Sequence, residues 1–312
     1  MATATHNDFW LTTSDLAAFL GESPEKLRGQ VLRMQPKLKF TSLVPPHVVR
    51  AILEDRGYKY PRKVVSVQML KGGVAKTTTV LNLGIRAAMY GAKVLFVDLD
   101  QQANLSFALG VDGEDKIIWL DIVEKKAKIA EAIVPVSENI DLVPSSLNNS
   151  VLDRVLLSSN RNWAQAVRGP LDWVRGKYDL ILIDTAPAIS AVNTAVTVAS
   201  DEVIFPVNPD RFSMLGLKKS LDELNEVRKD FDLIVRERIL FTRFDKREKA
   251  SHGFLEYCLD TYPDALMKSY IRTSSDFKNS VERGRTVFAN KGPAKEDYDL
   301  ATQELMGFET KP

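Results

Sequence analysis

The stretch that decides the fold is Val64-Val65-Ser66-Val67-Gln68-Met69-Leu70-Lys71-Gly72-Gly73-Val74-Ala75-Lys76-Thr77-Thr78-Thr79. It begins as a β-branched run typical of a buried strand, breaks into a glycine-rich turn, and continues into an apolar pattern with helical spacing. Such a loop binds phosphate, because its backbone N–H groups and the positive end of the following helix face the anion. The sequence therefore predicts nucleotide binding, in which Lys76 reaches the β- and γ-phosphates and Thr77 binds Mg²⁺.

The predicted cofactors are ATP and Mg²⁺. The predicted cofactor-binding residues are Lys71, Gly72, Gly73, Val74, Ala75, Lys76, Thr77 and Thr78. Two positions depart from the common form of the loop: Leu70 stands where its first glycine is expected, and Ala75 stands where glycine precedes the lysine. The methyl group of Ala75 crowds a backbone that must approach phosphate closely, and it restricts φ. We therefore expect weaker ATP binding than glycine would allow at this position.

Two further apolar runs end in carboxylates. Asp98 and Asp100 follow the run 93–97, and Asp184 follows the run 180–183. Ligands bind outside the carboxyl ends of parallel strands, so these side chains are expected beside the phosphate loop. There, one carboxylate organises the Mg²⁺ shell and another orients the attacking water. The alternative is that each carboxylate only caps the helix that follows it.

Short apolar runs alternate with helical patterns from residue 61 onward. The runs lie at 64–69, 93–97, 140–143, 180–183, 203–207 and 239–242. Continuous apolar runs of this length are typical of strands covered on both faces. Residues 61–312 are therefore expected to form an α/β domain, a mostly parallel, doubly wound P-loop NTPase sheet.

Residues 1–60 have a different pattern and are expected to form a small separate module. A helix capped near Thr12 and ending at Gly21 is followed by a second, basic helix that starts at Ser23 and carries Arg28 and Arg33. A wing strand is predicted over 37–41, and a third helix runs from Pro45 to near Gly57. This order predicts a winged helix-turn-helix that binds DNA. The alternative is a helical dimerisation cap whose basic residues are merely solvated.

Composition narrows the class of protein. The chain has 312 residues and a formal net charge of +1, so nucleic-acid binding must come from local basic patches. Its single cysteine, Cys258, excludes a disulfide framework and a multi-cysteine metal cluster within one subunit. The N-terminus lacks the pattern of a signal peptide, and no apolar stretch is long enough to span a bilayer. We expect a soluble, cytoplasmic protein.

Three segments resemble the ParA/MinD superfamily of deviant Walker A ATPases. They are the loop containing Lys71, the segment Asp98-Leu99-Asp100 with Gln102, and the segment Asp184-Thr185-Ala186-Pro187. The resemblance covers about residues 62–309. With the N-terminal module, the chain is most similar to plasmid-type ParA partition ATPases that carry a helix-turn-helix.

The resemblance implies a role for each site residue. Lys71 and Asp100 would be catalytic: Asp100 would position the hydrolytic water, and Lys71 would cross a dimer interface to the partner's ATP. The metal site would comprise Thr77, Asp98 in a supporting role, and Asp184 acting through water.

The resemblance also implies the function. An ATP-bound homodimer would bind DNA without sequence preference, associate with the nucleoid, and segregate a plasmid or chromosome. Its ATP hydrolysis, weak alone, would be stimulated by a ParB-like partner, and the N-terminal module would also bind the chain's own operator. The candidate DNA-binding residues are Arg28, Arg33, Arg272, Lys278, Arg283 and Arg285.

The alternative function is a MinD-like or cargo-positioning ATPase that acts on a membrane or a protein cluster. A membrane-bound member needs a basic, apolar C-terminal helix. The segment 303–312 is acidic and short, so no membrane partner is expected.

Overall fold

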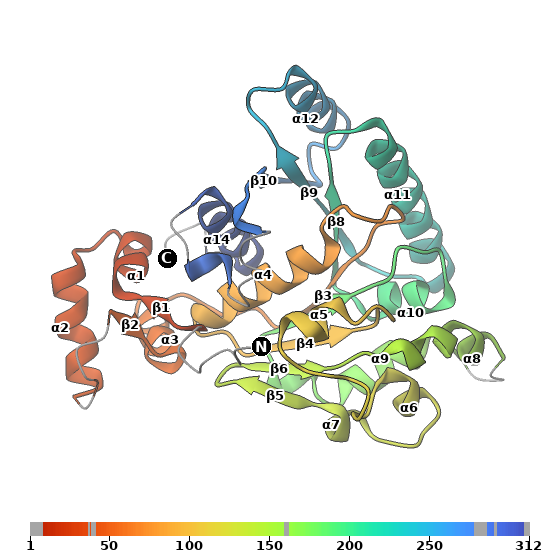
Figure 1. The fold of residues 1–312 in the computed structure, drawn as a ribbon, viewed down its shortest axis with the longest axis horizontal. Coiled ribbons are helices and arrows are strands. Elements are labelled where there is room, and N and C mark those ends of the chain that lie inside the picture. The colour runs from red at the N-terminus through yellow and green to blue at the C-terminus, as the bar shows by residue number, and fades with distance from the viewer. Residues whose placement is uncertain are drawn as a thin grey trace.

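The computed structural model describes residues 9–36, 38, 42–158, 162–277, 286–289 and 292–308. An eight-stranded sheet lies between two layers of helices, and a small helical region is attached at one end (Figure 1). The strand order is β10-β9-β8-β3-β7-β4-β6-β5. All neighbouring strands are parallel except β5, which pairs antiparallel with β6 at the sheet edge. The expected α/β, mostly parallel, doubly wound P-loop sheet is confirmed.

Six strands of this sheet coincide with the predicted apolar runs. The strands are β3 (Lys63–Val67), β4 (Val94–Asp98), β5 (Val134–Ser137), β6 (Ile140–Val143), β7 (Leu180–Asp184), β8 (Glu202–Val207), β9 (Arg236–Phe244) and β10 (Leu266–Arg272). Sequence reasoning did not find β5 and β10. Both are edge strands whose side chains are largely half-buried or exposed, so neither forms a continuous apolar run.

Helices cover both faces of the sheet. They are α4 (Lys76–Met89), α5 (Asn104–Ala108), α6 (Trp119–Val123), α7 (Ile129–Ala132), α8 (Leu152–Ser158), α9 (Gln165–Asp172), α10 (Ala191–Ala199), α11 (Arg211–Phe231), α12 (Lys249–Thr261) and α14 (Pro293–Met306), with 3₁₀ turns η2 (Leu147–Val151), η3 (Arg175–Lys177) and η4 (Val287–Ala289). In β7, Leu182 packs in the core under α4 and α14, whereas Ile183 packs in the core under α8 to α10. This two-sided burial explains why the central strands are continuously apolar.

The N-terminal region contains α1 (Thr13–Leu20), α2 (Pro24–Met34), α3 (Pro46–Asp55), and a short antiparallel pair, β1 (Leu11–Thr12) and β2 (Leu43–Val44). Thr12 caps α1, because its hydroxyl accepts a hydrogen bond from the Asp15 N–H at 3.0 Å. Gly21 ends α1 with a φ of 67°. The three predicted helices are thus present. Of the predicted wing at 37–41, only Leu38 is among the described residues.

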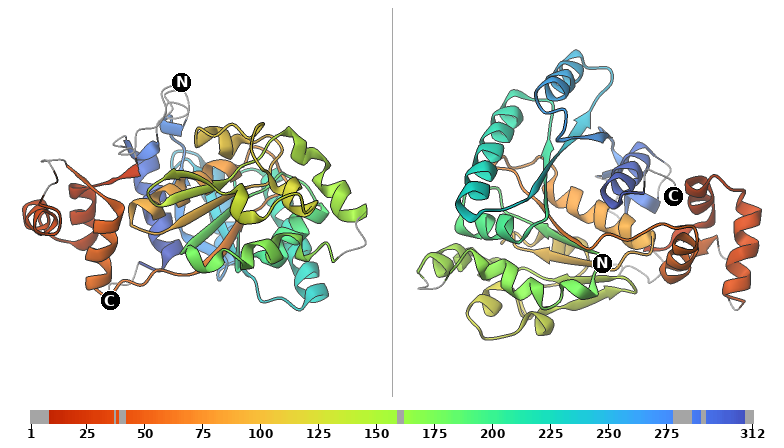
Figure 2. Two further views of the ribbon diagram at one scale, coloured as in Figure 1. Left: turned by 90° about the horizontal axis from the view of Figure 1, so that it is seen from below. Right: turned by 180° about the vertical axis from the view of Figure 1, so that it is seen from behind.

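The N-terminal region packs against α4 and α14 (Figures 1 and 2). The ring of Phe19 lies 4.9 Å from that of Tyr90 and 6.2 Å from that of Phe308, measured between centroids. The fully buried guanidinium of Arg86 lies 2.7 Å from Asp299 on α14 and 3.6 Å from Asp15 on α1. The helix that begins at the phosphate loop therefore ends against the N-terminal region. The domain boundary predicted between residues 60 and 61 lies in the segment between α3 and β3, and one apolar core continues across it.

The C-terminal helix α14 belongs to the core. Leu305 and Met306 are buried, and the Glu304 carboxylate accepts hydrogen bonds from backbone N–H groups of β10. None of the helices in the described ranges combines the length and the apolar character that crossing a bilayer requires.

Candidate functional site

The phosphate loop and two predicted carboxylates meet at the carboxyl ends of three neighbouring strands. In the parallel register, Val67 at the end of β3 pairs with Asp184 at the end of β7, and Asp184 pairs with Asp98 at the end of β4. The loop 68–75 leaves β3 at this edge, and α4 starts at Lys76. The structure therefore brings the loop, Asp98 and Asp184 together, as the sequence predicts.

The loop backbone is left-handed at two positions. Gly73 and Ala75 both have a φ of 73°. Gly72 and Gly73 are exposed, and a Cβ added to either would have no neighbour within 4 Å, so the loop surface is open to a ligand. Val74, which follows these glycines, is fully buried and anchors the loop in the apolar core. Ala75 therefore adopts a conformation that favours glycine, which agrees with the backbone restriction predicted there.

The substitution Ala75→Gly should stabilise this loop. A left-handed φ costs an alanine about 1 kcal/mol more than a glycine, so the free energy of unfolding should rise by about that amount. ATP should also bind several-fold more tightly, because the methyl group no longer crowds the backbone that approaches phosphate. Gly73→Ala is a matched control of equal φ and should change the free energy of unfolding in the opposite direction. Denaturant unfolding measures the first effect and ATP titration the second. If Ala75→Gly changes neither the free energy of unfolding nor the ATP affinity, the backbone at Ala75 is not strained.

Lys76 lies at the base of the loop and is only 7% exposed. Burial lowers the pKa of its ammonium, while the nearby carboxylates of Asp184 and Asp100 raise it. Among the described residues, no carboxylate forms an ion pair with this ammonium, so Lys76 is well placed to bind an anion at the N-terminus of α4. This position fits the predicted contact of Lys76 with the β- and γ-phosphates.

Asp184 and Asp98 are fully buried carboxylates at adjacent strand ends. Burial, together with the charge of Asp98, raises the pKa of Asp184 to about 8, and the Thr77 hydroxyl donates a hydrogen bond to Asp184 at 2.6 Å. Burial also raises the pKa of Asp98 to about 6, although it accepts hydrogen bonds from the Ser106 N–H and hydroxyl. Both oxygens of Asp98 are bound within the chain, since the other accepts from the Asp100 N–H at 3.2 Å.

These oxygen donors suit a magnesium ion. Mg²⁺ prefers hydroxyl, carboxylate and water oxygens, and the Thr77 hydroxyl and the Asp184 carboxylate lie in hydrogen-bond contact at the edge of the loop. Burial is the main cause of the raised pKa of Asp184, and a cation bound beside this carboxylate would favour its charged form. The residues present therefore fit the predicted metal, with Asp98 fixing the local backbone rather than offering a free oxygen.

Asp100 follows β4 and is 7% exposed. One of its oxygens accepts a hydrogen bond from the Gln102 N–H at 2.9 Å. This bond fixes the turn between β4 and α5, so the carboxylate has a defined position close enough to influence Lys76 electrostatically. Asp100 therefore has a fixed position, and its other oxygen accepts no hydrogen bond from the residues that the structure describes.

Lys71 forms a contact that sequence reasoning missed. Its ammonium lies 2.7 Å from both carboxylate oxygens of Asp210 and 3.0 Å from the Ser213 hydroxyl, at the start of α11. Burial alone would raise the pKa of Asp210, but the hydrogen bond from Lys71 lowers it. Asp210 also caps α11 through the Ser213 N–H, and this Asp-x-x-Ser spacing was the available signal in the sequence. In the monomer, Lys71 is therefore held on its own chain.

The candidate DNA-binding cations have different environments. Arg28 and Arg33 are exposed on α2. Arg272 bonds to Asp297 and Glu296, which raise its pKa, so much of its charge is compensated within the chain. The remaining predicted cations, Lys278, Arg283 and Arg285, lie outside the described residues.

A phosphate loop at a helix N-terminus, flanked by two buried carboxylates on adjacent strand ends, defines a P-loop nucleotide-binding protein. Residues 62–236 match a family model described as an AAA domain. A virulence plasmid ParA family protein of Chlamydia psittaci is 30% identical over 252 residues, which cover 78% of this chain and 94% of the relative. The chain belongs to the ParA family of deviant Walker A ATPases.

Two further similarities show the breadth of this family. The cell division protein PomZ of Myxococcus xanthus is 30% identical over 234 residues, covering 74% of this chain and 73% of PomZ. The structure of apo McdA from Cyanothece superposes with a TM-score of 0.71 and 25% identity, covering 78% of this chain and 98% of McdA. The predicted superfamily is confirmed, whereas the N-terminal region lies outside the matched family model.

Proposed function

We propose that this chain is a partition-type ParA ATPase. It binds ATP with Mg²⁺, dimerises, binds DNA without sequence preference, and is reset by hydrolysis that a ParB-like partner stimulates. The observation that carries this proposal is the position of Lys71, whose ammonium is held by Asp210 and Ser213 at the start of α11.

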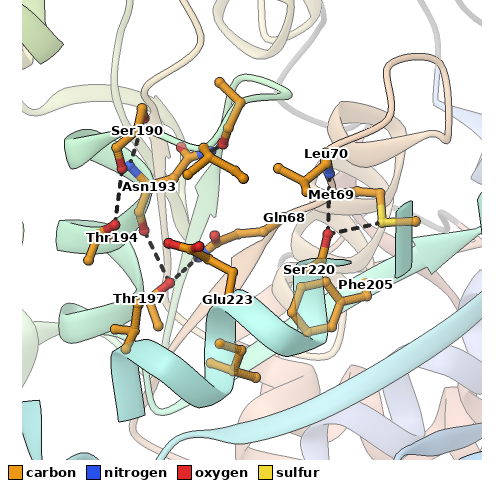
Figure 3. A pocket seen from close by; sticks show the side chains of 14 residues that line it. Gln68, Met69, Leu70, Ser190, Asn193, Thr194, Thr197, Phe205, Ser220 and Glu223 are labelled. Carbon is orange, nitrogen blue, oxygen red and sulfur yellow. Dashed lines mark hydrogen bonds between the residues drawn. The ribbon is translucent and has the colours of Figure 1, made fainter. Parts of the chain in front are cut away.

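The surroundings of Lys71 are those of an interface. Two large apolar side chains next to Ser213 on α11 are exposed, Phe212 at 75% and Leu215 at 53%, and Ile189, which lines one cleft together with Leu70 (Figure 3), is 63% exposed. Single exposed apolar side chains are common on protein surfaces, but a group of them is not. These residues therefore favour a contact with another protein here. In the proposed dimer, Lys71 leaves Asp210 and stabilises charge on the partner's ATP. Dimerisation then depends on the nucleotide, because the phosphates of the partner's ATP replace Asp210 as the binding partner of Lys71.

The other site residues act within one subunit. Lys76 and the backbone N–H groups of the loop bind the phosphates, and Asp100 orients the attacking water. Thr77 and Asp184 hold Mg²⁺, which neutralises charge on the phosphates when bound. Because the partner's Lys71 is absent in the monomer, hydrolysis is slow until the dimer forms.

Basic residues on α11 provide a further surface for DNA. Arg211, Lys218 and Lys219 are exposed, and they form no hydrogen bond or ion pair with any described residue. Contacts of this kind to phosphate carry no sequence information and weaken steeply with salt. Together with Arg28 and Arg33 they supply the charge by which the dimer binds nucleoid DNA, while the N-terminal helices contact the operator.

Gel retention of a long random-sequence DNA tests the proposal, with ATP–Mg²⁺, ADP–Mg²⁺ or no nucleotide at one fixed salt concentration. Retention only with ATP is the expected result, and it should weaken strongly when the salt is raised. Equal retention in all three samples would contradict nucleotide control and would assign DNA binding to the N-terminal region alone. If no sample is retained, a separate measurement of ATP binding shows whether the nucleotide site is inactive or whether the protein binds ATP but not DNA.

Cargo positioning is the second candidate, because PomZ, a cell division protein, is as similar in sequence as the plasmid relative. The internal ion pairs of Arg272 also favour it, since they remove one predicted phosphate contact. A protein partner that binds the ATP form in the absence of DNA would support this alternative.

A further inference from the structure

A chain of buried hydrogen bonds starts at Asp98 and leads away from the phosphate loop. Asp98 accepts two hydrogen bonds from Ser106 on α5, one from its N–H at 2.9 Å and one from its hydroxyl at 2.7 Å. The Ser106 hydroxyl in turn accepts a hydrogen bond from the N–H of Ser145, which lies in the segment after β6, at 3.0 Å. Ser106 and Ser145 are both buried. The carboxylate at the end of β4 is therefore tied to a second segment of the chain.

The chain of hydrogen bonds continues through Asn149 in η2. The amide nitrogen of Asn149 donates to the Ser145 hydroxyl at 2.8 Å, and its amide oxygen accepts from the Leu120 N–H, in α6, at 3.2 Å. Asn149 is buried as well, and both ends of its amide are used, so its orientation is fixed. Ser106, Ser145 and Asn149 thus form a relay that joins Asp98 to α6.

The Ser106 hydroxyl is the link that determines the strength of this relay. A serine hydroxyl donates one hydrogen bond, and because the Ser145 N–H occupies a lone pair of its oxygen, its proton faces Asp98. A hydrogen bond to an ionised carboxylate is stronger than one between neutral groups. Alanine at this position would leave Asp98 without one donor and the Ser145 N–H without an acceptor, both of them buried.

Asp98 holds both ends of the turn that contains Asp100. One of its oxygens accepts from the Asp100 N–H at 3.2 Å, and the other accepts from the Ser106 N–H in the first turn of α5. Ala103 stands at the N-cap of α5 and has no side-chain acceptor, so Asp98 takes over the role of the cap. The position of Asp100 therefore depends on that of Asp98.

We propose that Ser106 and Asn149 are positioning residues for ATP hydrolysis. They hold Asp98, and through it they hold Asp100 where its carboxylate orients the attacking water. The inference rests on the role proposed above for Asp100. A displacement of about 1 Å in such a group can lower a rate by about 100-fold. Because no member of the relay belongs to the loop 68–75, the relay controls the rate of hydrolysis and not the affinity for ATP.

Single variants test this separation of rate from affinity. Ser106→Ala should lower the rate of phosphate release about tenfold, and Asn149→Ala about threefold, since it acts through more bonds. Ser106→Thr keeps the hydroxyl and should restore the rate. The matched control is Ser146→Ala, which removes a buried hydroxyl of the same segment that accepts from the Asn148 N–H and lies outside the relay. This control should keep the wild-type rate, and all four variants should bind ATP as the wild type does.

A double-mutant cycle shows whether Ser106 acts through Asp100. In an Asp100→Ala background, Ser106→Ala should cause no further loss of rate, because the group that it positions is already absent. Losses that multiply would show that Ser106 acts independently of Asp100, and they would overturn the proposal. A wild-type rate in Ser106→Ala, or an equal loss in Ser146→Ala, would overturn it too.

Backbone hydrogen exchange of the nucleotide-free protein, followed by NMR, tests the relay without any ATPase activity. In Ser106→Ala, the N–H groups of Ser145 and Asp100 should exchange about tenfold faster relative to the Leu182 N–H in the central strand β7, which reports overall stability. Ser146→Ala should leave this ratio as it is. An unchanged ratio in Ser106→Ala would overturn the relay itself. A raised ratio, combined with normal turnover in Asp100→Ala, would overturn the positioning role and would place the error in the role of Asp100.

Discussion

Lys76→Ala should lose ATP affinity by about 100-fold or more. The substitution removes a buried cation at the N-terminus of α4, and a charge-assisted hydrogen bond to phosphate contributes about 3 kcal/mol in such a site. Calorimetric titration of the purified protein with ATP–Mg²⁺ measures the loss. The fold should persist, because removing a desolvated charge does not leave a partner carboxylate without its ion pair.

Lys229→Ala on the exposed surface of α11 is the matched control, since it removes the same charge far along the helix from the loop. Its ATP affinity should equal that of the wild type. Unchanged affinity in Lys76→Ala would contradict the assignment of the phosphate loop, whatever the other residues do.

Asp100→Ala should separate ATP binding from turnover. General acid–base and water-orienting groups contribute about 100-fold or more to rate, so phosphate release should fall by about that factor. ATP affinity should change little, because Asp100 follows β4 and does not belong to the phosphate loop. A coupled assay for phosphate, run with DNA present, measures the rate.

The exposed Asp115→Asn serves as a control that removes one carboxylate charge from the surface. It should leave the rate as it is. Normal turnover in Asp100→Ala would remove Asp100 from the catalytic step and shift that role to another group near the phosphates.

The central strands and the phosphate loop could be predicted because burial on both faces leaves a continuous apolar run, and because glycine and lysine mark the loop. The edge strands β5 and β10 could not, since solvent on one side mixes polar residues into them. The loop motif predicted that Ala75 restricts the backbone, whereas its left-handed φ is known only from the structure.

Contacts between segments that are far apart in the chain could not be predicted from the sequence. Lys71 and Asp210 lie 139 positions apart, and only the packing of α11 against the loop brings them together. The pairing of Arg272 with Asp297 depends in the same way on α14 lying against β10.

Sedimentation velocity of Asp100→Ala tests whether dimerisation is controlled by the nucleotide, because this variant should hold ATP without consuming it. With ATP–Mg²⁺ we expect a dimer that persists for the whole run, whereas with ADP–Mg²⁺ or no nucleotide we expect a monomer. A single sedimentation coefficient under all three conditions would contradict the proposal that ATP releases Lys71 from Asp210 to complete a second subunit's site.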